Sequence, residues 1–181
     1  MADDGVQRVL AVFTSAYSSY SGCRQYRENV IAARETVGAA APTIDKVRVF
    51  YNHPDFIVAN VERIRSAFEQ LPEASRSIAR VAFTAHSIPL SMANNCNYAV
   101  QLNETCRLIA SELELPAERW SLVYQSRSGR PGDPWLEPDV VDHIRTLHDQ
   151  EVKSLVIAPV GFLSDHMEVL FDLDEIGRAH V

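Results

Sequence analysis

The chain has 181 residues, and its 46% hydrophobic and 23% charged residues are ordinary proportions for a globular protein that is soluble in water. Its formal net charge is −7 and its basic residues are scattered, which argues against nucleic acid as a partner, because binding to phosphate needs clustered Lys and Arg. No apolar run approaches the roughly 18 residues that a membrane span requires. The opening residues, MADDGVQRV, are not typical of a secretory signal, so we expect a cytoplasmic protein.

Short apolar runs alternate with longer amphipathic stretches along the chain. The apolar runs predict strands at residues 9–13, 47–50, 81–84, 120–124 and 155–158. Helices are expected from near residue 23, after Pro54, around residues 102–113, over residues 140–147 and from near residue 165. This alternation predicts a three-layer, Rossmann-like α/β fold in which helices cover both faces of a mainly parallel sheet.

Ligands of open α/β sheets bind beyond the carboxyl ends of the strands. The segments that follow the predicted strands carry many titratable and aromatic side chains, namely His53, His86, Trp135, Asp165, His166, Glu168 and Asp172. No Gly-rich phosphate-binding motif follows a strand, which counts against nucleotide chemistry, and no G-x-S-x-G elbow is present. We therefore expect a binding site on this rim of the sheet.

Each of these residues also has an ordinary structural interpretation. His86 follows a buried strand, where a histidine can be a metal ligand or a base near neutral pH, or can simply hydrogen-bond its own loop. Glu168 and Asp172 are spaced i and i+4, so their carboxylates project from one helix face and could collect a cation or pass protons. Asp165 and Glu168 also fit a capping box, and on these residues alone the cap is the favoured interpretation.

The other candidates are similarly open. Trp135 lies in a loop rich in Gly and Pro, where it could stack on a flat ligand or pin the loop to the body. His53 and His166 could extend a proton relay or could be ordinary surface residues. The cysteines form no C-x-x-C pair and are expected to be reduced thiols. They are Cys23, Cys96 and Cys106.

Four segments of the sequence carry a family resemblance. They are FTSAYSSYSGCRQY at residues 13–26, VAFTAHSIPLS at 81–91, YQSRSGRPGDPWLEPD at 124–139 and APVGFLSDHMEVLFDLD at 158–174. Together and in this order they resemble the ferrochelatase family, and YSSYSGCRQY is most similar to its actinobacterial branch. The resemblance implies a chelatase-like fold and an enzyme of haem biosynthesis that inserts ferrous iron into a porphyrin, either coproporphyrin III or protoporphyrin IX.

The resemblance also implies roles for individual residues. His86 is similar to the active-site histidine of the family and Glu168 to the glutamate that faces it, and both are expected to contact the metal. Which of the two takes the pyrrole protons stays open. A polar chain that relays protons or metal is expected at Asp165, His166 and Asp172. Two aromatic residues are expected to contact the porphyrin, Tyr26 and Trp135.

Members of the family are longer at both ends. Residues 1–174 are therefore expected to be a ferrochelatase fragment, with one half-domain incomplete, that could be inactive by itself. The tail EIGRAHV, residues 175–181, departs from the family pattern and matches the translation of a common sequencing adapter, so we expect it to be non-native. The actinobacterial branch resembles one that carries a [2Fe–2S] cluster, for which Cys23 is a candidate ligand. Because such a cluster takes four ligands, none is expected in this chain.

Two other functions stay open. The chain could be a porphyrin- or metal-binding α/β module without catalysis. It could also resemble chelatases that insert cobalt or nickel into sirohydrochlorin-type rings. Those enzymes tend to rely on paired histidines, whereas here a single histidine is expected to face a glutamate, which argues against this second alternative.

Overall fold

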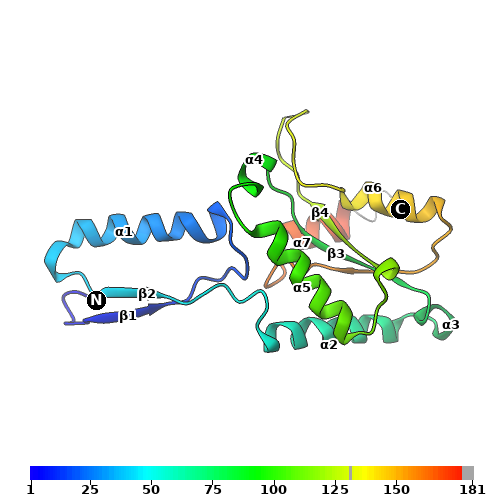
Figure 1. Ribbon diagram of the computed structural model, residues 1–181, viewed down its shortest axis with the longest axis horizontal. Coiled ribbons are helices and arrows are strands. Elements are labelled where there is room, and N and C mark those ends of the chain that lie inside the picture. Colours follow the sequence, from blue (N-terminus) through cyan, green and yellow to red (C-terminus); the bar gives the residue numbers. More distant parts are fainter. Residues whose placement is uncertain (131, 177–181) are drawn as a thin grey trace.

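A computed structural model describes residues 1–130 and 132–176 of the protein (Figure 1). Its strands are β1 (Arg8–Ala11), β2 (Thr43–Lys46), β3 (Arg80–His86), β4 (Trp120–Gln125) and β5 (Leu155–Ala158). Its α-helices are α1 (Gln25–Val37), α2 (Pro54–Gln70), α3 (Glu73–Arg76), α4 (Leu90–Ala93), α5 (Tyr98–Glu112), α6 (Val140–Asp149) and α7 (Met167–Val169). Two π-helical segments, η1 (Tyr20–Arg24) and η4 (Leu170–Ile176), and two 3₁₀ turns, η2 (Gly38–Ala40) and η3 (Ala117–Arg119), complete the described elements.

A three-stranded parallel sheet in the order β4-β3-β5 forms the centre of the main body. Side chains of a strand alternate between its two faces. Val81 and Phe83 of β3 pack with α2 and α5 in the main hydrophobic cluster, whereas Ala82 packs with Val123 of β4 and Val140 of α6. Helices therefore cover both faces of this sheet (Figure 1), and the predicted three-layer α/β fold is confirmed.

The helix α2 illustrates why these residues form these elements. Ile57 and Ile64 recur on one face and are buried against the sheet. Pro54 occupies the first turn, where its missing N–H group costs nothing. The ring nitrogen Nδ1 of His53 accepts a hydrogen bond from the amide of Asp55 at 3.3 Å, so this rim histidine is the cap of a helix. Among the described residues, no helix combines the length and apolar character that a bilayer crossing requires.

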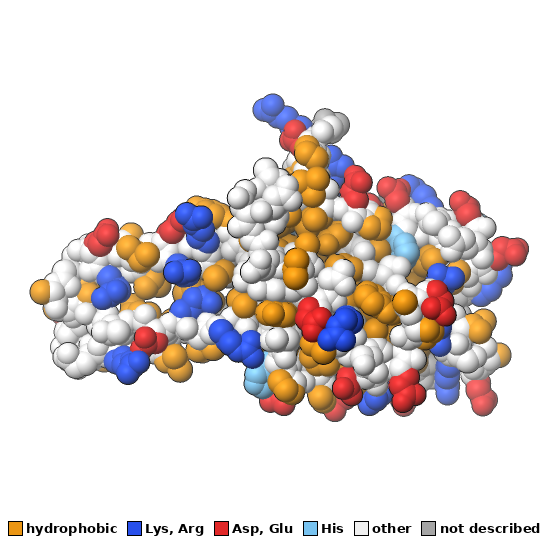
Figure 2. Space-filling view, in the orientation of Figure 1, with side chains coloured by type: hydrophobic (Ala, Val, Ile, Leu, Met, Phe, Trp, Pro, Cys, Tyr) orange, Lys and Arg blue, Asp and Glu red, His pale blue; other side chains and the backbone are white. Residues whose placement is uncertain are grey.

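The elements β1, α1 and β2 form an arm that extends away from the main body (Figure 1). Its two strands make a parallel pair of their own, so the described residues form two parallel sheets and not the single sheet that was predicted. The helix α1, which lies wholly within the described residues, buries none of its side chains. Leu10 and Val12 are 69% and 65% exposed, and Figure 2 shows hydrophobic side chains on the visible surface of this arm.

The second strand lies earlier in the chain than predicted. The amide of Val47 donates a hydrogen bond to the carbonyl oxygen of Ala11 at 2.9 Å, and because β1 ends at Ala11 the ladder ends there too. The prediction of a strand at residues 47–50 is therefore wrong. This segment connects the arm to the body, where the ring of Phe50 packs edge-on against Phe56 with centroids 5.7 Å apart. The apolar side chain of Phe50 is thus explained by this packing and not by a ladder.

Candidate functional site

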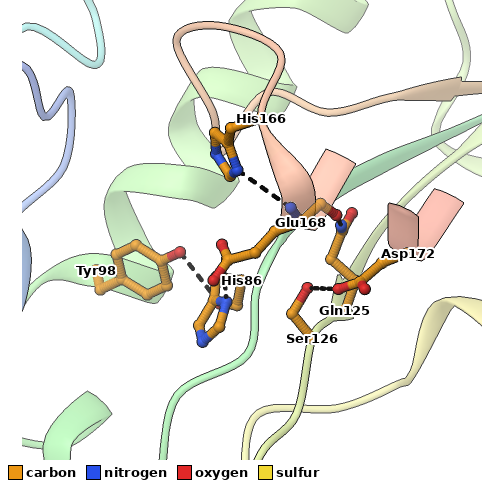
Figure 3. Close-up of polar contacts among 7 residues, drawn as sticks. All are labelled: His86, Tyr98, Gln125, Ser126, His166, Glu168 and Asp172. Atoms are coloured by element: carbon orange, nitrogen blue, oxygen red, sulfur yellow. Dashed lines mark hydrogen bonds and ion pairs between the residues drawn. The ribbon is translucent and has the colours of Figure 1, made fainter. Parts of the chain in front are cut away.

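The side chain of His86 points to the face of the sheet that the last helical segment covers. His86 is the last residue of β3. It lies an even number of residues after Ala82, so the two side chains share a face of the sheet, and Ala82 packs near Leu173 of η4. Gln125 is the last residue of β4 and pairs in register with His86, and its side chain shares a face with Val123 of the same cluster. Two polar side chains thus end adjacent strands on one face (Figure 3).

The loop after β5 passes very close to β3 on its way to this face. The amide of Gly161 donates a hydrogen bond to the carbonyl oxygen of Thr84 at 3.0 Å. A Cβ atom at position 161 would lie 2.6 Å from the Cα and Cβ atoms of Ala85, a distance that no side chain could occupy. The glycine of the PVGF segment therefore allows residues 162–168 to reach the rim.

The helix α7 starts at Met167, and its cap is His166. The Nδ1 atom of His166 accepts a hydrogen bond from the amide of Glu168 at 3.2 Å, in the place that a side-chain oxygen usually fills. The alternative that Asp165 and Glu168 form a capping box is therefore wrong, because Asp165 lies one residue too early. The side chain of Glu168 is instead directed to His86.

His86 and Glu168 meet at the rim (Figure 3). The Nδ1 atom of His86 lies 3.4 Å from Oε2 of Glu168, and the two side chains are 31% and 46% exposed. The contact lacks hydrogen-bond geometry, so Nδ1 has no hydrogen-bond partner among the described residues. An imidazole and a carboxylate this close together can share a proton or contact a divalent cation.

A hydrogen bond from Tyr98 holds the backbone of His86 in place. The hydroxyl group of Tyr98 donates this hydrogen bond to the backbone carbonyl oxygen of His86 at 3.1 Å. Burial raises the pKa of Tyr98 well above its ordinary value, so the hydroxyl group keeps its proton and remains a donor. The backbone at His86 is thus held by a buried side chain of α5.

Two residues that were not among the predicted site residues hold the last helical segment. The side-chain amide of Gln125 donates a hydrogen bond to the backbone carbonyl oxygen of Glu168 at 2.5 Å, and the hydroxyl group of Ser126 donates one to the carboxylate of Asp172. Ser126 has a φ of 60°, a left-handed conformation that is uncommon outside glycine. The signal for both residues was their position at the carboxyl end of a predicted strand.

His166 and Asp165, two of the three predicted relay residues, differ in their surroundings. The ring of His166 packs against Phe162 with centroids 5.0 Å apart while its Nδ1 atom caps α7. Asp165 is exposed and lines a hollow of about 620 Å³ together with residues of α2 and β5. Among the described residues, no group of three or more His, Cys, Asp or Glu side chains is arranged to hold a metal ion.

Trp135 and Tyr26, the predicted porphyrin contacts, lie in different parts of the molecule. The backbone of Trp135 forms a bridge with Pro89, and its indole lies so close to Gly129 that a Cβ atom there would overlap the ring. Trp135 therefore pins its loop to the segment that follows His86. Tyr26 belongs to α1 of the arm, is 50% exposed and packs against Phe13 with ring centroids 5.3 Å apart.

The three cysteines are free. Cys23 of η1 and Cys96, which follows α4, line one hollow of about 840 Å³. Cys106 is buried in the core, and burial raises the pKa of its thiol well above the ordinary value. A [2Fe–2S] cluster takes four ligands. Two of the three thiols line this hollow and the third is in the core, so the described residues do not fit such a cluster.

The protein is an α/β protein in which parallel strands lie between two layers of helices. A histidine and a carboxylate meet at the carboxyl ends of these strands, where they can bind a cation or exchange a proton. The chain belongs to the ferrochelatase family. The family model described as Ferrochelatase matches residues 1–181, and the predicted family is thereby confirmed.

Several curated relatives are similar over almost the whole chain. It is 57% identical over 176 residues to a ferrochelatase of Rhodopirellula baltica, an alignment that covers 97% of the chain and 49% of the relative. It is 46% identical over 193 residues to a coproporphyrin III ferrochelatase of Streptomyces griseus, covering 96% of the chain and 51% of the relative. A coproporphyrin III ferrochelatase of Corynebacterium glutamicum is 45% identical over 184 residues, covering 96% and 49%. The chain thus spans about half the length of the curated relatives it matches.

Proposed function

We propose that this chain supplies the His86–Glu168 site of an enzyme that inserts ferrous iron into a porphyrin in haem biosynthesis. The observation that carries the proposal is the 3.4 Å contact between Nδ1 of His86 and Oε2 of Glu168 at the carboxyl end of the sheet. Membership of the ferrochelatase family supports the reaction type. The names of the actinobacterial relatives favour coproporphyrin III over protoporphyrin IX as the porphyrin.

The reaction requires the two groups that the rim provides. A porphyrin must lose two pyrrole protons while Fe²⁺ loses its water ligands and enters the ring. A neutral imidazole is both a ligand for Fe²⁺ and a base near neutral pH, and a carboxylate can contact the ion or accept a proton. In this proposal His86 and Glu168 are the two catalytic residues, and both contact the metal.

The same proposal assigns supporting roles to other residues. His166 and Asp172 are assigned to a relay of protons or metal along this segment. The assignment is supported by the cap that His166 forms at Glu168 and by the position of Asp172 one helical turn beyond Glu168. Asp165 is assigned to the outer end of the relay because it is exposed. Tyr26 and Trp135 are assigned to the porphyrin as aromatic contacts.

A second candidate function is a porphyrin- or metal-binding module without catalysis. It is favoured by the exposure of the Glu168 side chain, 46%, and by the half-length match to the relatives. Excluding water strengthens the electrostatic interactions of an active site. An open rim could therefore bind the porphyrin or the ion and still not catalyse the insertion.

One experiment separates the two functions. The chain, and a completed protein in which the flanking segments of the Rhodopirellula baltica relative extend it at both ends, are incubated without oxygen with Fe²⁺ and either coproporphyrin III or protoporphyrin IX. Metallation is followed by the absorbance of the porphyrin. Activity of the completed protein that disappears in His86→Ala supports the enzyme, whereas equal activity in that variant refutes the site. Binding without metallation in both proteins supports the module.

Two further assignments belong to this proposal. Cytoplasmic localisation is supported by the three free thiols, since reduced cysteines are usual in that compartment. Cys23 is assigned as a [2Fe–2S] ligand only in a protein whose remaining segments supply the other ligands. Iron analysis and the visible absorption spectrum of the completed protein, with Cys23→Ser for comparison, test that assignment.

A further inference from the structure

Both backbone polar groups of Glu168 are bound by side chains. Its amide donates to Nδ1 of His166 at 3.2 Å, and its carbonyl oxygen accepts from the side-chain amide of Gln125 at 2.5 Å. The helix α7 has only three residues and continues as a π-helical segment, so few hydrogen bonds within the helix hold the backbone at Glu168 itself. These two hydrogen bonds are the side-chain contacts that hold the backbone of Glu168 directly (Figure 3).

Gln125 connects Glu168 to the strand that carries His86. The two residues are register partners in β4 and β3, and the carbonyl oxygen of Gln125 accepts a hydrogen bond from the amide of Ser87 at 2.8 Å. The backbone of Gln125 is thus fixed beside His86 while its side chain holds Glu168. Gln125 therefore links the two residues of the candidate site, His86 and Glu168.

The orientation of the Gln125 amide is determined by its partner. A carbonyl oxygen accepts only from the amide nitrogen, so Oε1 points elsewhere, and it is buried with no hydrogen-bond partner among the described residues. An unpaired buried oxygen is unfavourable, and a hydrophobic residue would avoid it. A position needed only for packing would not favour glutamine.

We propose that Gln125 is a positioning residue that sets the Glu168 carboxylate against the His86 imidazole. Gln125 is 1% exposed and so does not touch the substrate. It acts through Glu168, and Ser126 extends the same attachment by one helical turn to Asp172. The effect of Gln125 on iron insertion rests on the proposed function, whereas its effect on the position of Glu168 relative to His86 does not.

The geometric consequence is measured on the 181-residue chain by nitrogen NMR of the His86 ring. Glu168→Gln changes the charge next to Nδ1 and is expected to shift the ring signals of His86. In a Gln125→Met background the same change should shift them by less than about half as much, because the glutamate is then displaced. Gln101→Met is the matched control, since Gln101 is also buried but binds the amide of Ser18 at 2.7 Å. An equal shift in the Gln125→Met background overturns the proposal.

A measurement without any substitution covers the case in which Gln125→Met does not fold. One side-chain amide proton of Gln125 should exchange slowly with solvent in the native chain, because it is buried and bonded to the Glu168 carbonyl oxygen. Exchange at the rate of an exposed glutamine overturns the proposal.

The catalytic consequence is measured on the completed protein. Gln125→Met should slow iron insertion by up to about a hundredfold, the scale expected when a reacting group is misplaced. Because Gln125 acts through Glu168, adding Gln125→Met to Glu168→Gln should cost little more. Losses that multiply in the double variant overturn the proposal. If the completed protein inserts no iron at all, the proposed function fails, while the NMR comparison still decides the role of Gln125.

Discussion

The hydroxyl group of Tyr17 donates a hydrogen bond to the backbone carbonyl oxygen of Val160, 2.8 Å away, and thereby joins the segment after β1 to the loop after β5. Both residues are buried. Burial raises the pKa of Tyr17 far above its ordinary value, which keeps the hydroxyl group protonated as a donor. The loop that delivers Glu168 to the rim is thus attached to the main core by a residue distant in the sequence.

Tyr17→Phe should lower the free energy of unfolding by about 1 to 3 kcal/mol, because it leaves a buried carbonyl oxygen without a partner. Urea denaturation monitored by circular dichroism measures the change. Tyr26→Phe is the matched control, since Tyr26 is half exposed, and it should change stability very little. Equal denaturation midpoints for the parent and Tyr17→Phe would contradict the role of this hydrogen bond.

Gly161→Ala should destabilise the protein by about 1 to 3 kcal/mol, because the added methyl group overlaps the backbone of β3. The nearest atoms are Cα and Cβ of Ala85, at 2.6 Å from the position of the new Cβ. The loop must shift and move Glu168 relative to His86, so the NMR signals of the His86 ring should also change in this variant. A variant with native stability and an unchanged His86 signal would show that the loop does not pass as close as described.

His143 should make the stability of the protein depend on pH. Burial, and next the charge of Arg80, lower the pKa of His143 below its ordinary value of about 6.5. The unfolded chain therefore binds the proton more readily than the folded one, and stability is lost as the pH falls below that ordinary value. Denaturation at about pH 7 and about pH 5 should show a smaller loss in His143→Gln than in the parent. The exposed His148 provides the control, and an equal loss in His143→Gln and His148→Gln contradicts the prediction.

The arm should bind a hydrophobic dye such as anilinonaphthalene sulfonate, because Leu10 and Val12 are largely exposed. Replacing both with Asp should reduce the dye fluorescence and leave the unfolding of the body almost unchanged. For comparison, Leu102→Ala in the core should cost about 2 to 5 kcal/mol. A large loss of stability in the double Asp variant would mean that these side chains are covered in solution.

Much of the fold could be predicted from the sequence because the strands of the body are apolar runs, and the central strand β3 is buried on both faces. The run Leu155–Ala158 is apolar throughout and was predicted with its observed bounds. In α2 and α5 the spacing of Ile57, Val61, Leu102 and Cys106 reports which face is buried. The strand predicted at residues 47–50 is wrong because a connecting segment with Val47, Val49 and the core-packed Phe50 resembles a short strand in composition.

The site was less predictable than the fold. The position of His86 after a buried strand could be read from the sequence, but the cap at His166 could not, since Asp165 and Glu168 match a familiar capping pattern equally well. For Gln125 the only signal was its position at the end of a predicted strand, because its role depends on a carbonyl group that is distant in the sequence. The catalytic roles of His86 and Glu168 stay predictions.

In the proposed function, the Glu168 carboxylate acts together with His86 on the iron or on the pyrrole protons. The decisive measurement is the initial rate of ferrous iron insertion in the completed protein carrying Glu168→Gln. Glu104→Gln is the control, since Glu104 is a half-buried glutamate paired with Arg107. We expect a loss of about a hundredfold or more for Glu168→Gln and native activity for the control. Native activity in Glu168→Gln would contradict the proposed function.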